Sequence, residues 1–343
     1  AAKLGIPLLR WDFVKEYRES VLDYMYDEYK AGRTPNPDVL CNKFVKFGFW
    51  LDKAKESGFD FIATGHYARL GREIRNSKFE IRNKFKNQNY KLLEAKDDNK
   101  DQTYFLHQLN QKQLQHILFP IGNYTKPEVR KMAKKFGLPN AGKEESMGIC
   151  FVGEVPMKNF LMKKIKTQKG KIVLSNGTQV GEHDGLPFYT IGQRQGLRSS
   201  CHSERSEESL SQSSNGQRSF AGTQDDNTRP LYVVDKNFDK NELIVGYEDD
   251  PLLYKKEAEV ADINWISQEP KLPLNCEVRL RHRQPLQKAV VRLLTLDSSR
   301  LSKVQSLKSK VLIQFSKSQR AVTPGQFAVF YSNGECLGGG VIV

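Results

Sequence analysis

The sequence predicts an α/β domain over residues 1–165, a small central β-rich domain over residues 166–250 and a C-terminal β-barrel over residues 251–343. In the first part, helix-period apolar patterns alternate with short apolar strands, which indicates a parallel sheet. In the third part, repeated short strands are separated by turn residues, which is typical of a small barrel. A chain of 343 residues is long enough for each part to bury its own core.

The overall charge favours a polyanionic partner. Fifty-four Lys and Arg against 40 Asp and Glu give a formal net charge of +14, which makes nucleic acid the first candidate. No apolar run reaches the roughly 18 residues of a membrane span, and no signal peptide opens the chain, so we expect a cytoplasmic protein with no membrane association. The five cysteines form neither a Cys-x-x-Cys pair nor a dense framework, so we expect no metal site and no disulfide scaffold.

The first elements are a strand expected at 8–13 and a helix expected at 14–31. The chain begins with residues typical of the end of a helix and has no initiating Met. We therefore expect that the first βα units of the α/β domain are missing.

The stretch 32–42 reads Gly-Arg-Thr-Pro-Asn-Pro-Asp-Val-Leu-Cys-Asn. Prolines on both sides of Asn36 restrict the backbone, which predicts a stiff, extended loop. Asp38 and Cys41 follow in the first turn of a helix expected at 39–57, where the pKa of a thiol can be lowered. The alternative is an N-capping Asp followed by a buried structural Cys.

The remaining elements of the first part are assigned by pattern. A strand at 59–69 runs into the turn Gly65-His66, at the strand end where parallel sheets bind ligands. Lys100-Asp101-Gln102 precedes a helix and, taken alone, could be no more than a solvated helix start. We further expect a surface hairpin at 72–94, helices at 112–117, 126–136 and 155–166, a capping box of Thr125 with Glu128, and Cys150 between glycine turns.

The central and C-terminal parts are mostly strands. The central domain has strands over 170–197 and 230–236, separated by a serine-rich insertion at 199–229 that we expect to be disordered. The basic stretch 279–284 is a candidate phosphate-contacting edge. Barrel strands are expected at 276–283, 289–294, 310–315, 326–331 and 336–343, with Cys276 and Cys336 in the core.

Six motifs in this order resemble those of the tRNA-specific 2-thiouridylases of the MnmA type. They lie at 32–42, 63–69, 100–106, 148–154, 188–194 and 323–326. The resemblance implies an adenine-nucleotide alpha-hydrolase-like α/β domain, truncated here at its N-terminus, followed by the central domain and the barrel.

The resemblance also implies a reaction, the ATP-dependent 2-thiolation of the wobble uridine of tRNA. ATP, with Mg²⁺, would adenylate the C2 oxygen, and sulfur would arrive as a persulfide on Cys150. Cys41 would attack that persulfide, releasing sulfide or closing a Cys41–Cys150 disulfide. Asp38 would act as general acid/base, and the sulfur donor would be a sulfur-relay protein or a cysteine desulfurase.

Further residues take roles by the same resemblance. Asn36, Pro37 and Asp38 would contact the flipped-out target base, and Gly65 would contact ATP. The positions that would meet tRNA are His66, Lys100, Asp101, Gln102, Arg281, His282 and Gln326.

One departure from the family matters for activity. The family opens with Ser-Gly-Gly-Val-Asp-Ser, a pyrophosphate-binding loop, and this chain has no such stretch. We therefore expect the chain as given to be inactive without that loop. Two alternatives are a catalytically incomplete tRNA-binding remnant, and an ATP pyrophosphatase-type ligase of small molecules, which leaves both cysteines and the basic barrel without a role.

Overall fold

The computed structural model describes residues 1, 4–74, 88–143, 153, 156–197, 229–294 and 310–343. Cys150 and nearly all of the serine-rich insertion lie outside these residues. Within the described part of the chain, no helix is long and apolar enough to cross a membrane.

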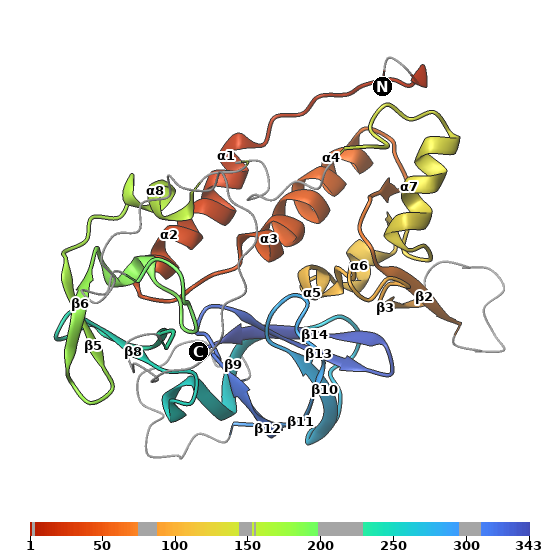
Figure 1. Ribbon diagram of the computed structural model, residues 1–343. Helices are drawn as coiled ribbons and strands as arrows, with labels where there is room; N and C mark the ends of the chain where they lie inside the picture. The colour runs from red at the N-terminus through yellow and green to blue at the C-terminus, as the bar shows by residue number, and fades with distance from the viewer. Residues whose placement is uncertain (2–3, 75–87, 144–152, 154–155, 198–228, 295–309) are drawn as a thin grey trace, which may run out of the picture.

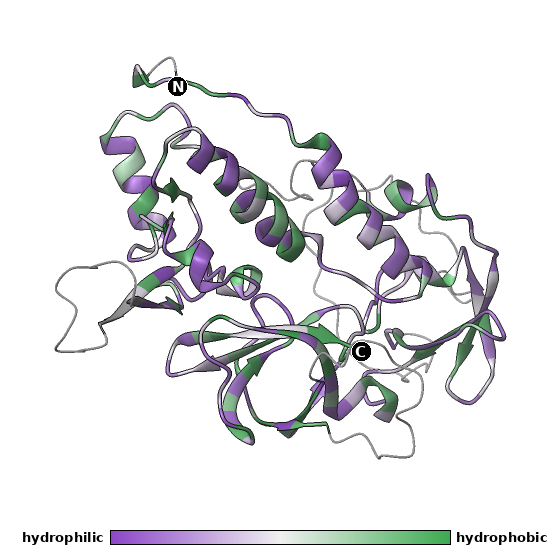
Figure 2. Cartoon of the chain, turned by 180° about the vertical axis from the view of Figure 1, so that it is seen from behind, coloured by the Kyte–Doolittle hydropathy of each residue, from purple (hydrophilic) through white to green (hydrophobic). Residues whose placement is uncertain are grey.

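Two long helices lie side by side above the barrel (Figure 1). Both carry polar and apolar faces (Figure 2), and their apolar residues, such as Val21, Val39 and Val45, are buried in one core. The first consists of α1 (Val14–Tyr17), η2 (Arg18–Leu22) and α2 (Asp23–Lys30), and the second of α3 (Pro37–Leu40), η3 (Cys41–Phe49) and α4 (Trp50–Glu56).

Both predicted helices are confirmed, but the second starts two residues early. Pro37 occupies its first turn, because the fixed φ of proline suits that position and its missing N–H costs nothing there. The strand expected at 8–13 is wrong. Leu8 is 80% exposed in an irregular segment, and no strand of the described residues pairs with it, so its backbone gains nothing from an extended ladder.

The parallel sheet is represented by β1 (Ile62–Ala63) and β4 (Ile117–Leu118), which pair in parallel. The expected hairpin is formed by β2 (Arg69–Ile74) and β3 (Gln88–Leu93). The helices that follow are α5 (Thr103–Leu106), α6 (Gln111–Leu114) and α7 (Lys126–Lys135). The capping box of Thr125 and Glu128 is present at the start of α7, as predicted.

The barrel is closed by the pairing of β13 with β14. It consists of β9 (Tyr254–Trp265), β10 (Leu274–Arg279), β11 (Gln287–Leu293), β12 (Val311–Arg320), β13 (Phe327–Ser332) and β14 (Glu335–Ile342). We had not predicted β9. Cys276 and Cys336 are buried, as expected.

The N-terminal part and the barrel share one sheet. β14 also pairs with β3, with Cys336 opposite Leu92, so the hairpin β2–β3 extends the barrel sheet. Their cores merge as well, since Leu92 and Leu106 pack in one cluster with Phe327 and Val329. The N-terminal part and the barrel therefore share both a sheet and a hydrophobic core.

The central domain lies beside the barrel (Figure 1). Its sheet has the order β6-β5-β8-β7, formed by β5 (Gly170–Leu174), β6 (Gln179–His183), β7 (Tyr232–Asn237) and β8 (Glu242–Gly246). Before it, α8 (Met157–Met162) packs through Leu161 against Met25 and Tyr29 of α2.

Candidate active site

The loop between the two long helices is held by the barrel. The backbone N–H of Thr34 donates to the carbonyl of Pro324 at 2.9 Å. The side chain of Gln326 donates from Nε2 to the carbonyls of Thr34 at 2.8 Å and Pro35 at 3.3 Å. The barrel turn 323–326 therefore fixes the backbone of this loop from one side.

The central domain holds the same loop from another side. The ammonium of Lys236 on β7 donates to the carbonyl of Gly32 at 2.9 Å, and burial lowers the pKa of Lys236 to about 8. Thr34 Oγ1 and Thr190 Oγ1 are 3.1 Å apart. Gly32 has φ of +78° and lies against the ring of Phe238, so a side chain at position 32 would be strained and would clash.

Asp38 follows this loop in the first turn of α3. Asn36 is extended, with φ of −116° and ψ of 96°, which confirms the predicted extended conformation. The N-cap alternative for Asp38 is wrong, because Asn36 occupies the cap position and Asp38 lies inside the helix. The Oδ1 atom of Asp38 is buried and has no hydrogen-bond partner among the described residues. Leaving such an acceptor unsatisfied costs about 1–3 kcal/mol, so this oxygen is available to a further donor.

Cys41 is fully buried and begins η3. We expected it in the first helical turn, but it is the fifth residue of a helix that starts at Pro37, so the position was off by one turn. Because Cys150 lies outside the described residues, the approach of the two thiols stays a prediction.

Asn42 is a residue that we did not assign to the site from the sequence. It is 2% exposed, its Nδ2 donates to the carbonyl of Phe105 at 3.3 Å, and its Oδ1 has no partner in the described part of the chain. The only sequence signal was its place as the last residue of the motif at 32–42.

Gly65 lies just beyond the carboxyl end of β1 and is exposed. A Cβ added there would meet no atom of the residues that the structure describes within 4 Å. The open space above this backbone fits the approach of a nucleotide, in the position where parallel sheets bind ligands.

His66 does not face solvent. It is 9% exposed, with its ring 5.6 Å from Phe47 and 6.1 Å from Phe119, and its Nδ1 lies 2.8 Å from Thr64 Oγ1. Burial, with the charge of Lys46, lowers the pKa of His66 to about 3. The side chain is therefore a neutral, mostly buried group that offers tRNA no positive charge, and the tRNA contact expected at His66 stays a prediction.

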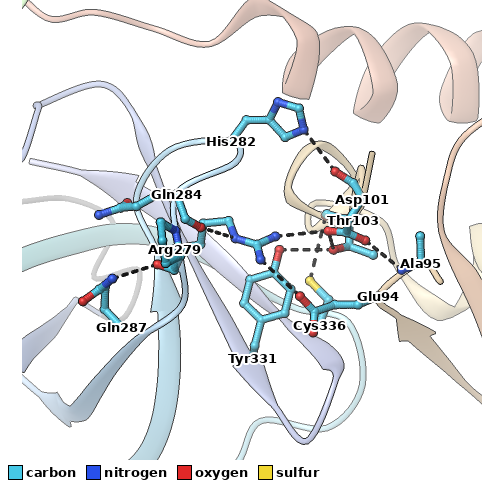
Figure 3. Close-up of polar contacts among 11 residues, drawn as sticks. Glu94, Ala95, Asp101, Thr103, Arg279, His282, Gln284, Gln287, Tyr331 and Cys336 are labelled. Atoms are coloured by element: carbon cyan, nitrogen blue, oxygen red, sulfur yellow. Dashed lines mark hydrogen bonds and ion pairs between the residues drawn. The ribbon is translucent and has the colours of Figure 1, made fainter. Parts of the chain in front are cut away.

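Asp101 is also a core residue (Figure 3). Its carboxylate accepts hydrogen bonds from Ala95 N at 2.9 Å, Thr103 Oγ1 at 2.6 Å and Arg279 Nη1 at 3.1 Å. Tyr331 OH is 3.2 Å from Thr103 Oγ1. The side chain of Asp101 is 3% exposed and engaged inside the protein, so a tRNA contact at this position would involve its backbone and stays a prediction.

Arg279 joins the N-terminal domain to the barrel. Besides Asp101, its guanidinium pairs with Glu94 at 3.2 Å and lies 5.0 Å from the ring centroid of Tyr331 (Figure 3). Burial raises the pKa of Glu94, and the nearby charge of Asp101 raises it further. Arg279 thus connects the barrel to the N-terminal domain through buried ion pairs and is not part of a phosphate-contacting edge.

The other basic residues of the stretch 279–284 differ in how far their side chains are buried. Arg281 Nη2 donates to Ile191 O at 2.9 Å, to Ala321 O at 3.1 Å and to Thr323 Oγ1 at 2.8 Å. The ring of His282 packs at a tilt against Phe105, with 4.5 Å between the ring centroids; its Nε2 lies 3.0 Å from Asp101 O, and burial lowers its pKa. Both remain half-buried, whereas Arg283 is exposed.

Lys100 and Gln102 flank Asp101 and are half-buried. Gln102 Oε1 accepts from the backbone N–H of Tyr67 at 3.0 Å. The Lys-Asp-Gln stretch therefore hydrogen-bonds to other segments of the N-terminal domain, through Asp101 to Ala95 and through Gln102 to Tyr67. The tRNA contacts of Lys100 and Gln102 stay a prediction.

Three family models match the chain in succession. They are described as the tRNA methyl transferase HUP domain over residues 1–154, the tRNA methyl transferase PRC-barrel domain over residues 158–206, and the aminomethyltransferase β-barrel domain over residues 255–342. Their order confirms the expected sequence of an α/β nucleotide-type domain, a central domain and a barrel.

Curated relatives match over the whole chain. The tRNA-specific 2-thiouridylase MnmA of Coxiella burnetii (strain RSA 493 / Nine Mile phase I) is 43% identical over 345 residues, covering 100% of this chain and 82% of the relative. The protein of the same description from Acinetobacter baumannii (strain SDF) is 41% identical over 346 residues, and that from Acinetobacter baylyi is 39% identical over 348 residues. Both alignments cover 100% of this chain and 82% of the relative.

Proposed function

The chain belongs to the tRNA-specific 2-thiouridylase MnmA family, and we propose that it is a tRNA-uridine 2-sulfurtransferase that thiolates the wobble uridine of tRNA at the expense of ATP. The observation that carries this proposal is the carboxylate of Asp38, half-buried and with an unpartnered Oδ1 three positions before Cys41. A carboxylate with one oxygen left unpartnered by the described residues, on a helix whose entry loop is fixed by two domains, is suited to meet a substrate.

The proposed reaction replaces the C2 oxygen of uridine by sulfur. ATP, with Mg²⁺, makes that oxygen a leaving group by transferring AMP to it and losing pyrophosphate. The terminal sulfur of a persulfide on Cys150 then forms a bond to C2, and AMP leaves with the oxygen. The Cys41 thiolate attacks the Cys150 sulfur and breaks the S–S bond of the persulfide, which leaves sulfur on C2 and a Cys41–Cys150 disulfide.

A second order of events uses the same residues. Cys41 first attacks the persulfide, which releases sulfide, and the sulfide then attacks C2. Both orders end with a Cys41–Cys150 disulfide that an external thiol must reduce. Both also need a proton to move at the base, which is the role we assign to Asp38 as general acid/base.

We assign the other contacts in line with the geometry. Asn36 and Pro37, in the stiff entry to α3, would lie along the flipped-out base together with Asp38. Gly65 would present its backbone to ATP. Lys100, Gln102, Arg281 and His282 would face tRNA through their accessible atoms, and a sulfur-relay protein or a cysteine desulfurase would deliver the persulfide.

The domain limits 1–165, 166–250 and 251–343 are part of this proposal. The inactivity expected of the chain as given stays a prediction, and an assay of this chain with tRNA, ATP and a sulfide source would test it.

The test is formation of 2-thiouridine in tRNA, measured by nucleoside mass spectrometry with ATP and a sulfide source. We expect product with the wild type and at least a 100-fold loss in Cys41→Ser when sulfur is supplied as a persulfide on Cys150, with unchanged tRNA affinity. Substitution of Cys276, which is buried in the barrel core, by Ala is the matched control and should retain the product.

Two results would contradict the proposal. Tight tRNA binding with no 2-thiouridine would favour the tRNA-binding remnant. ATP-dependent chemistry on a small molecule, with no affinity for tRNA, would favour the ligase.

A further inference from the structure

We infer that Gln326 is a positioning residue: it holds the loop 32–36 in the conformation in which Asp38 meets the target base, and it does not itself contact tRNA phosphate. This inference rests on the proposed function, since it assigns a role in that reaction. It departs from the tRNA contact that the family resemblance implied for Gln326.

The first argument is the use of the amide group. Nε2 of Gln326 lies 2.8 Å from Thr34 O and 3.3 Å from Pro35 O. Both partners are carbonyl oxygens, which only accept hydrogen bonds. The amide must therefore turn its nitrogen toward them, and its two N–H groups donate to these two oxygens. What remains is Oε1, an acceptor, which cannot bond to the oxygens of a phosphate.

The second argument is the hydrogen-bond accounting of the loop. Pro35 and Pro37 have no N–H, so the stretch from Thr34 to Pro37 has few ways to anchor its own backbone. The barrel turn supplies the missing hydrogen bonds. Pro324 O accepts from Thr34 N at 2.9 Å, and Gln326 Nε2 donates to the carbonyls of Thr34 and Pro35. The conformation of the loop is therefore imposed by the barrel.

The third argument is close approach at Gly325. Its φ is +89°, and a Cβ there would lie 2.9 Å from Thr34 N. The turn thus needs glycine both for its backbone conformation and for the space that the loop occupies. The backbone of the turn at Gly325 and the backbone of the loop at Thr34 are therefore closely packed against each other.

A fixed loop matters because Asp38 is only three residues beyond Pro35. Between them stand Asn36 and Pro37, and the ring of Pro37 fixes its φ, so displacement of the Pro35 carbonyl moves the start of α3. A misplacement of about 1 Å at a reacting group can cost about 100-fold in rate. Loss of the Gln326 amide should therefore lower kcat and leave the affinity for tRNA nearly unchanged.

The experiment compares Gln326→Met and Gln326→Glu with Gln314→Met. Met keeps the length of the side chain without donors, and Glu replaces the donating nitrogen by an oxygen that faces two carbonyls. Gln314 lies on β12 with Glu257 as its side-chain partner and serves as the control. Three quantities are measured: kcat for 2-thiouridine at saturating tRNA, Kd for tRNA at several salt concentrations, and hydrogen exchange of the Thr34 amide.

We expect kcat to fall at least tenfold in both Gln326 variants, Kd to change less than twofold with the same salt dependence, and exchange at Thr34 to rise at least tenfold. The control should change none of the three. Gly325→Ala acts on the same contact without touching the amide, and it should give the same pattern even if a Gln326 variant folds poorly.

The inference is overturned if Kd weakens fivefold or more while kcat at saturating tRNA is retained, because Gln326 would then be a tRNA contact. It is equally overturned if wild-type and variant proteins share the same kcat and the same exchange at Thr34. Failure of the proposed function looks different, since the wild type itself would then make no 2-thiouridine.

Discussion

Arg279 on β10 and Asp101 in the Lys-Asp-Gln-Thr motif form a buried ion pair with an N–O distance of 3.1 Å, although 178 positions separate them in the sequence. Their side chains are 11% and 2% exposed. The pair, together with Glu94, ties the barrel to the N-terminal domain in the region where their sheets join at β3 and β14.

We predict that Arg279→Met destabilises the protein by about 3–5 kcal/mol, because Asp101 and Glu94 would remain as buried carboxylates without a cation. Denaturant unfolding measures this change. Arg292→Met, at an exposed position on β11, is the control and should stay within about 0.5 kcal/mol of the wild type. A loss below about 1 kcal/mol for Arg279→Met would show that the pair does not hold the domains together.

Arg283 should contribute to tRNA binding where Arg279 does not, since Arg283 is the exposed member of the basic stretch. Arg283→Gln should weaken tRNA binding and lower the slope of log Kd against log salt by about 1, the effect of one lost phosphate contact. Arg292→Gln, near the C-terminal end of β11, removes the same charge and should change the slope less. Equal effects of the two substitutions would mean that only net charge matters.

Asp38→Asn should lower the rate of 2-thiouridine formation by about 100-fold or more, the usual contribution of a general acid/base. The free energy of unfolding should fall by no more than about 1 kcal/mol, because the change removes only a favourable charge from the first helical turn. Asp52→Asn, exposed on the same long helix, should keep full activity. Full activity of Asp38→Asn would remove the carboxylate from the mechanism.

His66 should make the protein acid-sensitive. Its pKa is about 3 in the folded protein against 6.5 as the ordinary value, so between these pH values the unfolded chain binds a proton that the folded protein does not. The free energy of unfolding should therefore fall as the pH is lowered below 6.5, by about 1.4 kcal/mol per pH unit for this group. His107, whose pKa burial lowers to about 4, adds a second contribution of the same sign.

The test compares the slope of stability against pH in the wild type and in His66→Asn between pH 6.5 and 5. In the variant, the slope of the free energy of unfolding against pH should be smaller by the contribution of about one proton, about 1.4 kcal/mol per pH unit, whatever its absolute stability. An unchanged slope would mean that His66 is protonated in the folded protein.

Local features were predictable because they depend on neighbours a few positions away. The extended Pro-Asn-Pro loop, the capping box at Thr125 and Glu128 and the β2–β3 hairpin all follow from backbone restriction and short-range patterns. The motifs at 32–42 and 323–326 were likewise visible, but nothing in the sequence showed that they touch.

The sequence by itself determined the order of the three parts, the positions of Asp38 and Cys41 near a helix start, and the basic character of the chain. Only the tertiary structure decided which polar side chains are buried. Asp101, His66 and Arg279 lie in stretches for which the sequence suggested contact with tRNA, yet the pairing of β3 with β14 and the packing of Phe47 and Phe119 enclose their side chains. Burial depends on which distant segments cover a side chain, and a charged residue accepts it only when another element supplies its partner, as Arg279 does for Asp101.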